Sequence, residues 1–278
     1  MKVDAHQHFW RLADRTGAWP PAELAAIHRD FGAEDLAPLL RENGIDATVL
    51  VQSLPTTDDT ATLLEIARNT RFVRGVVGWA DLKAADAVDA IASLAREPLL
   101  KGLRPMLQDL QEDDWIADPA LAPAAEAMAR HGLVFDALVM PRHLAALHAF
   151  AVAHPTLAIV VDHAAKPFIA RGTLEPWRTD MARLAALPRV HCKLSGLLTE
   201  APAGAGRATL QPFVQAAWTL FGPHRLLWGS DWPVLRLASD YTAWCALAET
   251  LIDAVDPPPS DADRAALFGG NAAALYRL

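Results

Sequence analysis

The chain begins Met1-Lys2-Val3-Asp4-Ala5-His6-Gln7-His8-Phe9-Trp10, a run typical of a short β-strand that carries two histidines one residue apart. In a strand, side chains at positions i and i+2 point to the same face. His6 and His8 therefore project side by side, close enough to hold one metal ion or one polarised carbonyl oxygen. Whether this pair is a site or ordinary packing depends on the rest of the sequence.

The composition indicates a globular protein with a large core, since 52% of its 278 residues are hydrophobic. The formal net charge of −8 argues against nucleic acid or an anionic membrane as a partner, because both favour clustered Lys and Arg. The two cysteines, Cys192 and Cys245, lack metal-binding spacing and are typical of buried thiols in a reducing compartment. With no visible signal peptide or membrane span, we expect a cytoplasmic protein.

Short apolar, β-branched runs alternate with Ala- and Leu-rich segments of helical periodicity along the chain. Near-continuously apolar strands that alternate with helices predict a parallel sheet covered on its faces. Eight such units, with no Gly-rich dinucleotide loop after the first strand, favour a single-domain α/β fold of the (β/α)8 TIM-barrel type over an open sheet. The predicted strands are Val3–Phe9, Ala47–Gln52, Val73–Ala80, Leu100–Pro105, Val134–Val139, Ala158–Asp162, Val190–Ser195 and Leu226–Ser230. The predicted helices are Asp58–Asn69, Ala84–Ala95, Pro119–Arg130, Arg142–Ala153, Glu175–Ala186, Gln211–Phe221 and Asp240–Val255.

Two segments interrupt this alternation. Residues 10–45, which include Trp19-Pro20-Pro21, form an insertion after the first strand, and we expect part of it to be a loop over the barrel mouth. The tail Asp261–Leu278 predicts a terminal helix over residues 271–278, preceded by Gly269-Gly270 and with Asn271 as its N-cap.

Polar side chains gather at the predicted C-terminal ends of the strands, where α/β barrels place their active sites. Taken alone, Asp231 could cap the following helix, Arg104 could form a structural ion pair, and His163 could be a core histidine. Convergence from seven of the eight predicted strands is harder to explain by packing, and it favours a functional site. In chain order these ends hold His6 and His8, Gln52, Trp79 and Asp81, Arg104, His163, Lys193 and Ser195, and Asp231 with Trp232.

The residue types at these ends suit attack of water on a carbonyl group. The imidazoles of His6, His8 and His163 could bind one divalent ion or hydrogen-bond a carbonyl oxygen. Asp231 could act as general base towards water or as a fourth metal ligand.

Other side chains at the mouth suit recognition of a polyhydroxylated or anionic substrate. An arginine can form forked hydrogen bonds, and tryptophans offer flat apolar walls against which sugar rings stack. The expected substrate-binding residues are Arg104, Trp10, Trp79, Gln52, Lys166, Lys193 and Trp232.

Several motifs resemble the sugar-lactonase branch of the amidohydrolase superfamily, which includes hydrolases of L-fuconolactone and L-rhamnonolactone. The similarity runs from the first strand to the last helix, and the combination of motifs is specific although each is short. The motifs are Asp4–Trp10, Asp162–Pro167, Lys193–Leu197, Gly229–Pro233 and Gly270-Asn271-Ala272.

The resemblance implies a (β/α)8 barrel that hydrolyses an aldonolactone, L-fuconolactone foremost. It places His6, His8 and His163 on the carbonyl oxygen or on a metal, and it assigns Asp231 to the activation of water. The expected partner is therefore a small sugar lactone, with neither nucleic acid nor membrane involved.

Binuclear members of the superfamily carry a bridging Lys or Glu on the fourth or fifth strand and an added His on the fifth. Here Lys101 lies only at the start of the fourth predicted strand, and Val134–Val139 contains no histidine. We therefore expect either no metal or one divalent ion, Zn²⁺ in that case, on His6, His8, His163 and Asp231.

Two other functions remain open at this point. A metal-dependent decarboxylase of the same superfamily shares the first-strand motif and would need a tightly bound ion and a carboxylate substrate. A non-catalytic sugar-binding barrel would bind a ligand without turnover and would leave Asp231 without a role.

Overall fold

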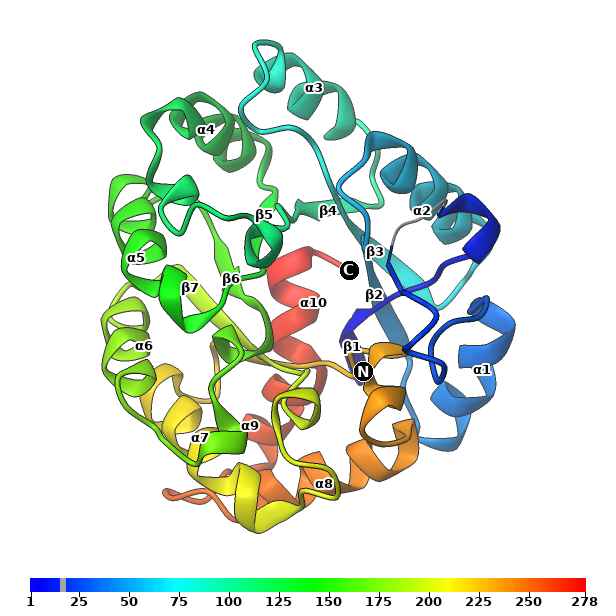
Figure 1. Ribbon diagram of the computed structural model, residues 1–278, viewed down its shortest axis with the longest axis vertical. Helices are drawn as coiled ribbons and strands as arrows, with labels where there is room; N and C mark the ends of the chain where they lie inside the picture. The colour runs from blue at the N-terminus through cyan, green and yellow to red at the C-terminus, as the bar shows by residue number, and fades with distance from the viewer. Residues whose placement is uncertain (16–18) are drawn as a thin grey trace.

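The computed structural model describes residues 1–15 and 19–278, and within them eight strands form one parallel sheet in chain order (Figure 1). The N–H of His8 donates to the carbonyl of Trp232 (2.7 Å), and the N–H of Asp231 donates to the carbonyl of His6 (2.8 Å). These bonds close the sheet between its first and last strands, which confirms the predicted (β/α)8 barrel. The strands are β1 (Val3–Gln7), β2 (Ala47–Val51), β3 (Val73–Gly78), β4 (Leu100–Leu103), β5 (Val134–Ala137), β6 (Ile159–Val161), β7 (Val190–Leu194) and β8 (Leu226–Trp228).

Helices surround the sheet, and seven of those in the outer ring match the predicted segments. The first outer helix, α1, lies inside the segment 10–45 and was not predicted as a helix. Pro38 in its middle disguises its helical pattern, because proline normally ends or kinks a helix. The outer helices are α1 (Ala33–Glu42), α2 (Thr57–Asn69), α3 (Ala87–Leu94), α4 (Ala122–His131), α5 (Leu144–Ala153), α6 (Trp177–Ala185), α7 (Arg207–Phe221) and α8 (Tyr241–Asp253).

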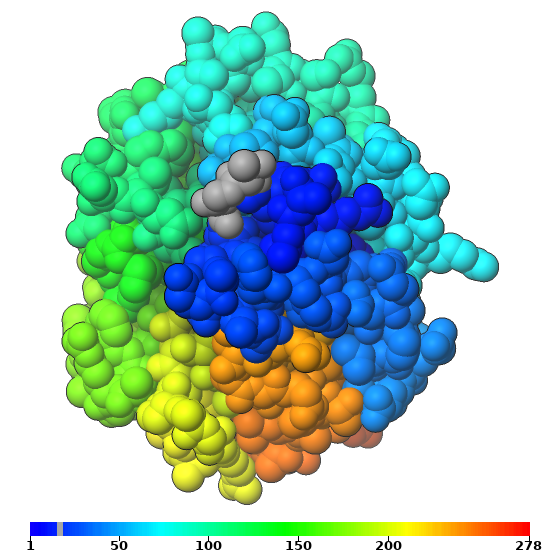
Figure 2. Space-filling view, turned by 45° about the vertical axis from the view of Figure 1, so that its right-hand side comes forward, coloured from blue at the N-terminus to red at the C-terminus, as the bar shows by residue number. Residues whose placement is uncertain are grey.

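Residues 10–15 and 19–32 of this segment lie along the end of the barrel that carries the C-termini of the strands. Trp10 and Phe31 form an antiparallel bridge (3.0 and 2.9 Å) that fixes both ends of this loop. Phe31 also packs edge-on against Trp232, just after β8. Figure 2 shows this blue N-terminal segment on the surface, against the orange segment around β8 and α8. The described parts of this segment therefore lie over one side of the barrel mouth.

The tail forms α9 (Asp261–Ala265), a wider helical turn (Ala266–Gly270) and α10 (Asn271–Tyr276). The prediction that Asn271 is the N-cap is wrong, because Asn271 is the first helical residue and its amide donates to the carbonyls of Pro223 and Leu226 (2.7 Å each). This amide therefore joins the tail to the start of β8. Ala272 and Tyr276 pack inside the barrel with the inward side chains of the strands, so α10 closes the end opposite the mouth (Figure 1).

A β-bulge in β1 sets the direction of the two histidines. The pairing with β2 shifts register between Asp4 and Gln7, so that β1 carries one extra residue. Asp4 turns towards α8, where Tyr241 donates to its carboxylate (3.0 Å), whereas His6 faces the barrel interior. Regular alternation would place both on one face, and bulges commonly redirect a side chain beside an active site.

No helix in the described ranges is both long and apolar enough to cross a lipid bilayer.

Candidate active site

The carboxylate of Asp231 lies at the centre of the candidate site. Its Oδ1 atom is 3.3 Å from Nε2 of His8, 3.8 Å from Nε2 of His6 and 3.9 Å from Nε2 of His163. These four side chains are no more than 6% exposed. β1, the turn after β6 and the end of β8 supply them, so the fold brings together residues from both ends of the sequence.

Strained backbone carries two of these residues. Asp231 has a φ of 59°, and the run His163–Lys166 has φ values of 53°, 49°, 60° and 50°. Left-handed conformations cost residues other than glycine roughly 1–2 kcal/mol each, and such strain concentrates at functional sites. The indole N–H of Trp177 donates to the carbonyl of Ala164 (2.7 Å) and holds the turn in place.

Asp4 fixes the backbone just before Asp231. Its buried carboxylate accepts hydrogen bonds from the N–H and hydroxyl of Ser230 (2.8 and 2.6 Å), and from the N–H of His6 (3.2 Å). Burial raises the pKa of Asp4 to about 6, although these donors oppose the shift. Asp4 therefore links the loop that carries Asp231 to the strand that carries His6.

The hydrogen-bond partners of the imidazoles indicate their tautomers. Nδ1 of His8 lies 2.7 Å from the carbonyl of Val51, which can only accept, so this nitrogen carries the proton. In the neutral ring, Nε2 of His8 is then an acceptor facing the Asp231 carboxylate at 3.3 Å. Two acceptors this close need a shared proton or cation between them. Nδ1 of His163 lies 2.8 Å from the hydroxyl of Ser195, which leaves its Nε2 directed at Asp231.

Two cations lie beneath the imidazoles. The guanidinium of Arg104 is 3.3 Å from Nε2 of His6, and the ammonium of Lys193 is 3.2 Å from Nδ1 of the same ring. Lys193 also contacts Asp136 and lies 3.1 Å from Asp162, while Arg104 lies 3.4 Å from Asp162. These charged groups are almost completely inaccessible, so they form a buried network of two cations and two carboxylates.

The predicted substrate-binding residues do not all lie where a sugar could reach them. Lys193 is fully buried below His6, so it is not placed to reach sugar hydroxyls. Gln52 is also fully buried. Its side-chain amide donates to the backbone carbonyl of Arg104 (2.7 Å), and its backbone carbonyl accepts from the guanidinium of Arg104. Arg104 is 3% exposed, and its guanidinium lies beside Nε2 of His6. Lys166 is half-buried at the mouth, 3.9 Å from Glu200.

Two of the three predicted tryptophans belong to the packing of the N-terminal loop. Trp10 is buried, donates to the carbonyl of Arg29 (2.8 Å) and packs edge-on against Phe31. Trp232 is buried against Phe31 and Phe9. Neither ring therefore offers an open face to a sugar. Trp79 is half-buried, and its backbone pairs with the Thr60 hydroxyl (2.7 and 3.0 Å).

Several residues around the site were not predicted from the sequence. Asp136 and Asp162 balance the charge of Lys193, and Tyr276 donates to both oxygens of Asp136 (3.0 and 2.8 Å). Asp136 had a usable signal, since it is the one charged residue in the predicted strand Val134–Val139, and a buried charge needs a partner. Tyr276 had none, because its role depends on where α10 docks.

The charges of the site differ from those of the same groups in water. Burial lowers the pKa of His163 to about 4, and it also lowers the pKa values of His6 and His8. Burial alone would raise the pKa of Asp231, but the surrounding imidazoles, His163 foremost, hold it well below its ordinary value. At neutral pH the site therefore holds an ionised carboxylate among neutral imidazoles.

The donor set fits one divalent ion. His6, His163 and Asp231 each offer a ligand atom, and these atoms lie within 4.8 Å of one another. The opposed acceptors of His8 and Asp231 add a further reason for a cation at this point. In the described residues this is the one His/Asp group of that kind. Asp136, the carboxylate of β5, is occupied by Lys193 and Tyr276, and this agrees with the expectation of at most one ion.

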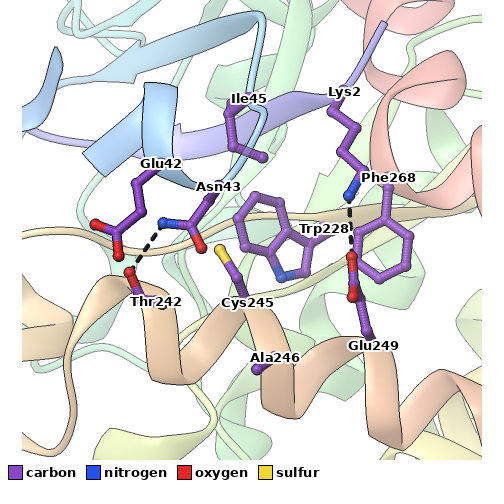
Figure 3. Close-up of a pocket in the computed structure, with 10 residues that line it drawn as sticks. All are labelled: Lys2, Glu42, Asn43, Ile45, Trp228, Thr242, Cys245, Ala246, Glu249 and Phe268. Atoms are coloured by element: carbon purple, nitrogen blue, oxygen red, sulfur yellow. Dashed lines mark hydrogen bonds and ion pairs between the residues drawn. The ribbon is translucent and has the colours of Figure 1, made fainter. Parts of the chain in front are cut away.

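A separate cavity of about 190 Å³ lies between α1 and α8 (Figure 3). Trp228 and Phe268 line one side of it, and the ion pair of Lys2 and Glu249 (2.9 Å) lies at its edge. Its lining shares no residue with the imidazole cluster, so it is not the catalytic pocket.

The fold and the His–Asp centre together define a (β/α)8-barrel hydrolase. The sequence model of the amidohydrolase family matches residues 3–278, and the chain belongs to this family. An L-fucono-1,5-lactonase of Burkholderia ambifaria is 56% identical over 281 residues, covering 100% of this chain and 96% of the relative. An L-fucono-1,5-lactonase of Burkholderia multivorans is 37% identical over 289 residues, covering 100% of this chain and 96% of the relative. The chain is also similar to an amidohydrolase from Burkholderia multivorans whose crystal structure contains bound zinc. The two are 37% identical and superpose with a TM-score of 0.93, covering 100% of this chain and 99% of the other.

Proposed function

We propose that this protein is a lactonase that hydrolyses an aldonolactone, with L-fucono-1,5-lactone as its substrate. The observation that carries this proposal is the ionised carboxylate of Asp231, 3.3–3.9 Å from a nitrogen of each of three imidazoles at the barrel mouth. The substrate follows from the two relatives, 56% and 37% identical, that bear the name L-fucono-1,5-lactonase. We propose that the enzyme acts in the cytoplasm and that its substrate is a free small-molecule lactone.

In the proposed reaction, the lactone carbonyl oxygen lies against His6, His8 and His163. Asp231 accepts a proton from water as the water oxygen bonds to the carbonyl carbon, and Arg104 beside His6 stabilises the developing negative charge. The bond between the carbonyl carbon and the ring oxygen then breaks, and Asp231 returns its proton to the ring oxygen. The product is the open hydroxy acid, which releases a proton into solution as it ionises.

One divalent ion, held by His6, His163 and Asp231, would supply Lewis-acid polarisation of the carbonyl when bound. The lactone is an ester and is easier to hydrolyse than an amide, so hydrogen bonds from Nε2 of His163 and from Arg104 also suit the reaction.

Acid release from a panel of 1,4- and 1,5-aldonolactones, followed with a pH indicator, tests the proposal. We expect the highest kcat/KM for L-fucono-1,5-lactone. Asp231→Asn should lower kcat by about 10²- to 10⁴-fold, the usual contribution of a general base, while thermal denaturation shows a folded protein. Parallel assays with a chelator and metal analysis establish whether turnover needs an ion.

Two results would contradict the proposal. Retained turnover in Asp231→Asn would remove the base assignment. Release of carbon dioxide from an aromatic carboxylate, with no lactone hydrolysed, would favour the decarboxylase alternative.

A further inference from the structure

Lys166 and Glu200 form a charged pair at the mouth that the mechanism above does not use. The ammonium of Lys166 and the nearer carboxylate oxygen of Glu200 are 3.9 Å apart, and the side chains are 23% and 25% exposed. Among the described residues, neither the ammonium of Lys166 nor the carboxylate of Glu200 has a hydrogen-bond partner closer than this. Two charges that are three-quarters shielded from water, with most of their hydrogen-bonding capacity unused, are costly unless something else fills it.

The positions of both residues place the pair beside the reacting groups. Lys166 ends the strained left-handed turn that begins at His163, so one turn sets the direction of both side chains. Glu200 ends the short turn Leu198–Glu200 after β7, and this turn packs against the turn Val234–Leu237 that follows Asp231. Burial raises the pKa of Glu200, Lys166 opposes this shift, and the charge of Asp231 adds to it. The pair therefore lies on the β6–β8 side of the mouth, within electrostatic range of Asp231.

The chemistry of the pair matches neighbouring hydroxyl groups. A carboxylate has two oxygens and about four acceptor positions, so it can accept from two adjacent hydroxyls at once, and an ammonium has three donors for hydroxyl oxygens. The other two cations expected to bind substrate, Arg104 and Lys193, are 3% and 0% exposed and are already held by buried carboxylates. Of these three cations, Lys166 alone is accessible from the mouth.

We propose that Glu200 and Lys166 form the hydroxyl-recognition subsite of the enzyme, with Glu200 accepting hydrogen bonds from two neighbouring ring hydroxyls and Lys166 donating to a hydroxyl oxygen. The inference rests on the proposed lactonase function and makes Glu200 a specificity-determining residue. A site built to hydrogen-bond hydroxyls discriminates strongly against substrates that lack them, because its polar groups are then left unpaired.

The test compares two lactones that differ in hydroxylation, L-fucono-1,5-lactone and δ-valerolactone. Glu200→Gln should lower kcat/KM for L-fucono-1,5-lactone by about 10- to 100-fold, the loss expected for hydrogen bonds to a charged group, and should leave δ-valerolactone almost unchanged. Lys166→Met should act in the same direction. Glu249→Gln is the matched control, since Glu249 pairs with Lys2 (2.9 Å) beside the cavity away from the imidazole cluster (Figure 3). It should change neither rate.

A binding measurement separates this inference from the proposed function. L-fuconate, the open product, should raise the thermal midpoint of the wild type and not that of Glu200→Gln. Equal losses on both lactones, or no loss on either, would overturn the subsite even in an active wild type. A wild type that hydrolyses no lactone but binds L-fuconate through Glu200 would overturn the proposed function and leave the subsite standing.

Discussion

Tyr276 offers the sharpest test of the buried charge network. Its hydroxyl, from α10 at the closed end of the barrel, donates to both oxygens of Asp136 (2.8 and 3.0 Å), and both side chains are fully buried. Asp136 in turn contacts Lys193, whose ammonium is 3.2 Å from His6. Tyr276→Phe removes this one donor and keeps the ring, so the packing of α10 is retained.

The expected loss follows from the charge of the acceptor. A hydrogen bond to a charged group contributes about 1.5–3 kcal/mol, which for a domain of this size corresponds to a drop of about 3–10 °C in the thermal midpoint. Burial raises the pKa of Asp136 to about 6 from its ordinary 3.8. The folded protein therefore binds an extra proton between these values, and this contribution to stability falls as the pH rises through that window. The phenol matters most when the carboxylate is ionised, so the loss should be larger at pH 8 than at pH 5.

Thermal denaturation of the wild type and Tyr276→Phe at both pH values measures the effect. The matched control is Tyr241→Phe, because Tyr241 is also buried and donates to a buried carboxylate, that of Asp4 (3.0 Å). Asp4 keeps three other donors, so the control should lose less. An unchanged midpoint in Tyr276→Phe, or a loss independent of pH, would refute the idea that Tyr276 stabilises the ionised form of Asp136.

Three further outcomes are expected. Asp4→Asn should lower the free energy of unfolding by about 1–3 kcal/mol, since an amide NH₂ must then face a donor from Ser230. Denaturation of both proteins at pH 7 measures this loss, and a variant as stable as the wild type would contradict the role of Asp4. Gly196→Ala should reduce turnover sharply while circular dichroism shows an intact fold, because φ is +61° there and a Cβ would lie 2.7 Å from Nδ1 of His163. Full activity would show that the structure relieves this steric clash without moving the imidazole. Burial lowers the pKa of His163 to about 4, so kcat/KM should stay level from neutral pH down to about pH 5.5 and fall as the pH drops through about 4, where the imidazolium would pair with Asp231. A half-point near 6.5 in the pH–rate profile would show that His163 titrates as it does in water.

The repeating part of the fold was readable from the sequence because it rests on local periodicity. Apolar runs of strand length and Ala/Leu-rich segments of helical period recur eight and seven times, and the strands and helices lie where these patterns predict. The helix α1 is the exception, because Pro38 breaks the pattern and tertiary packing overrides the local preference. Asn271 is another, since its amide bonds to carbonyls of a distant segment rather than to its own helix.

The candidate site was readable only in part. His6 lies near the end of β1, and His8, His163 and Asp231 follow strands. Parallel strands in a barrel end at the same rim, so the sequence alone indicated that these residues meet. No sequence pattern predicted the bulge that turns Asp4 and His6 to different sides of β1. Strand parity alone would have placed these two side chains on one face.

The sequence by itself determined the (β/α)8 barrel and the set of imidazoles and carboxylate at its mouth, because backbone periodicity and the common direction of parallel strands are local properties of the chain. Tertiary structure alone decided that Lys193 lies beneath His6, that Tyr276 reaches Asp136, and that Trp10 and Trp232 fill the core. Their roles depend on contacts between segments far apart in sequence. In a closed barrel those contacts are set by register and helix docking, which no local pattern records.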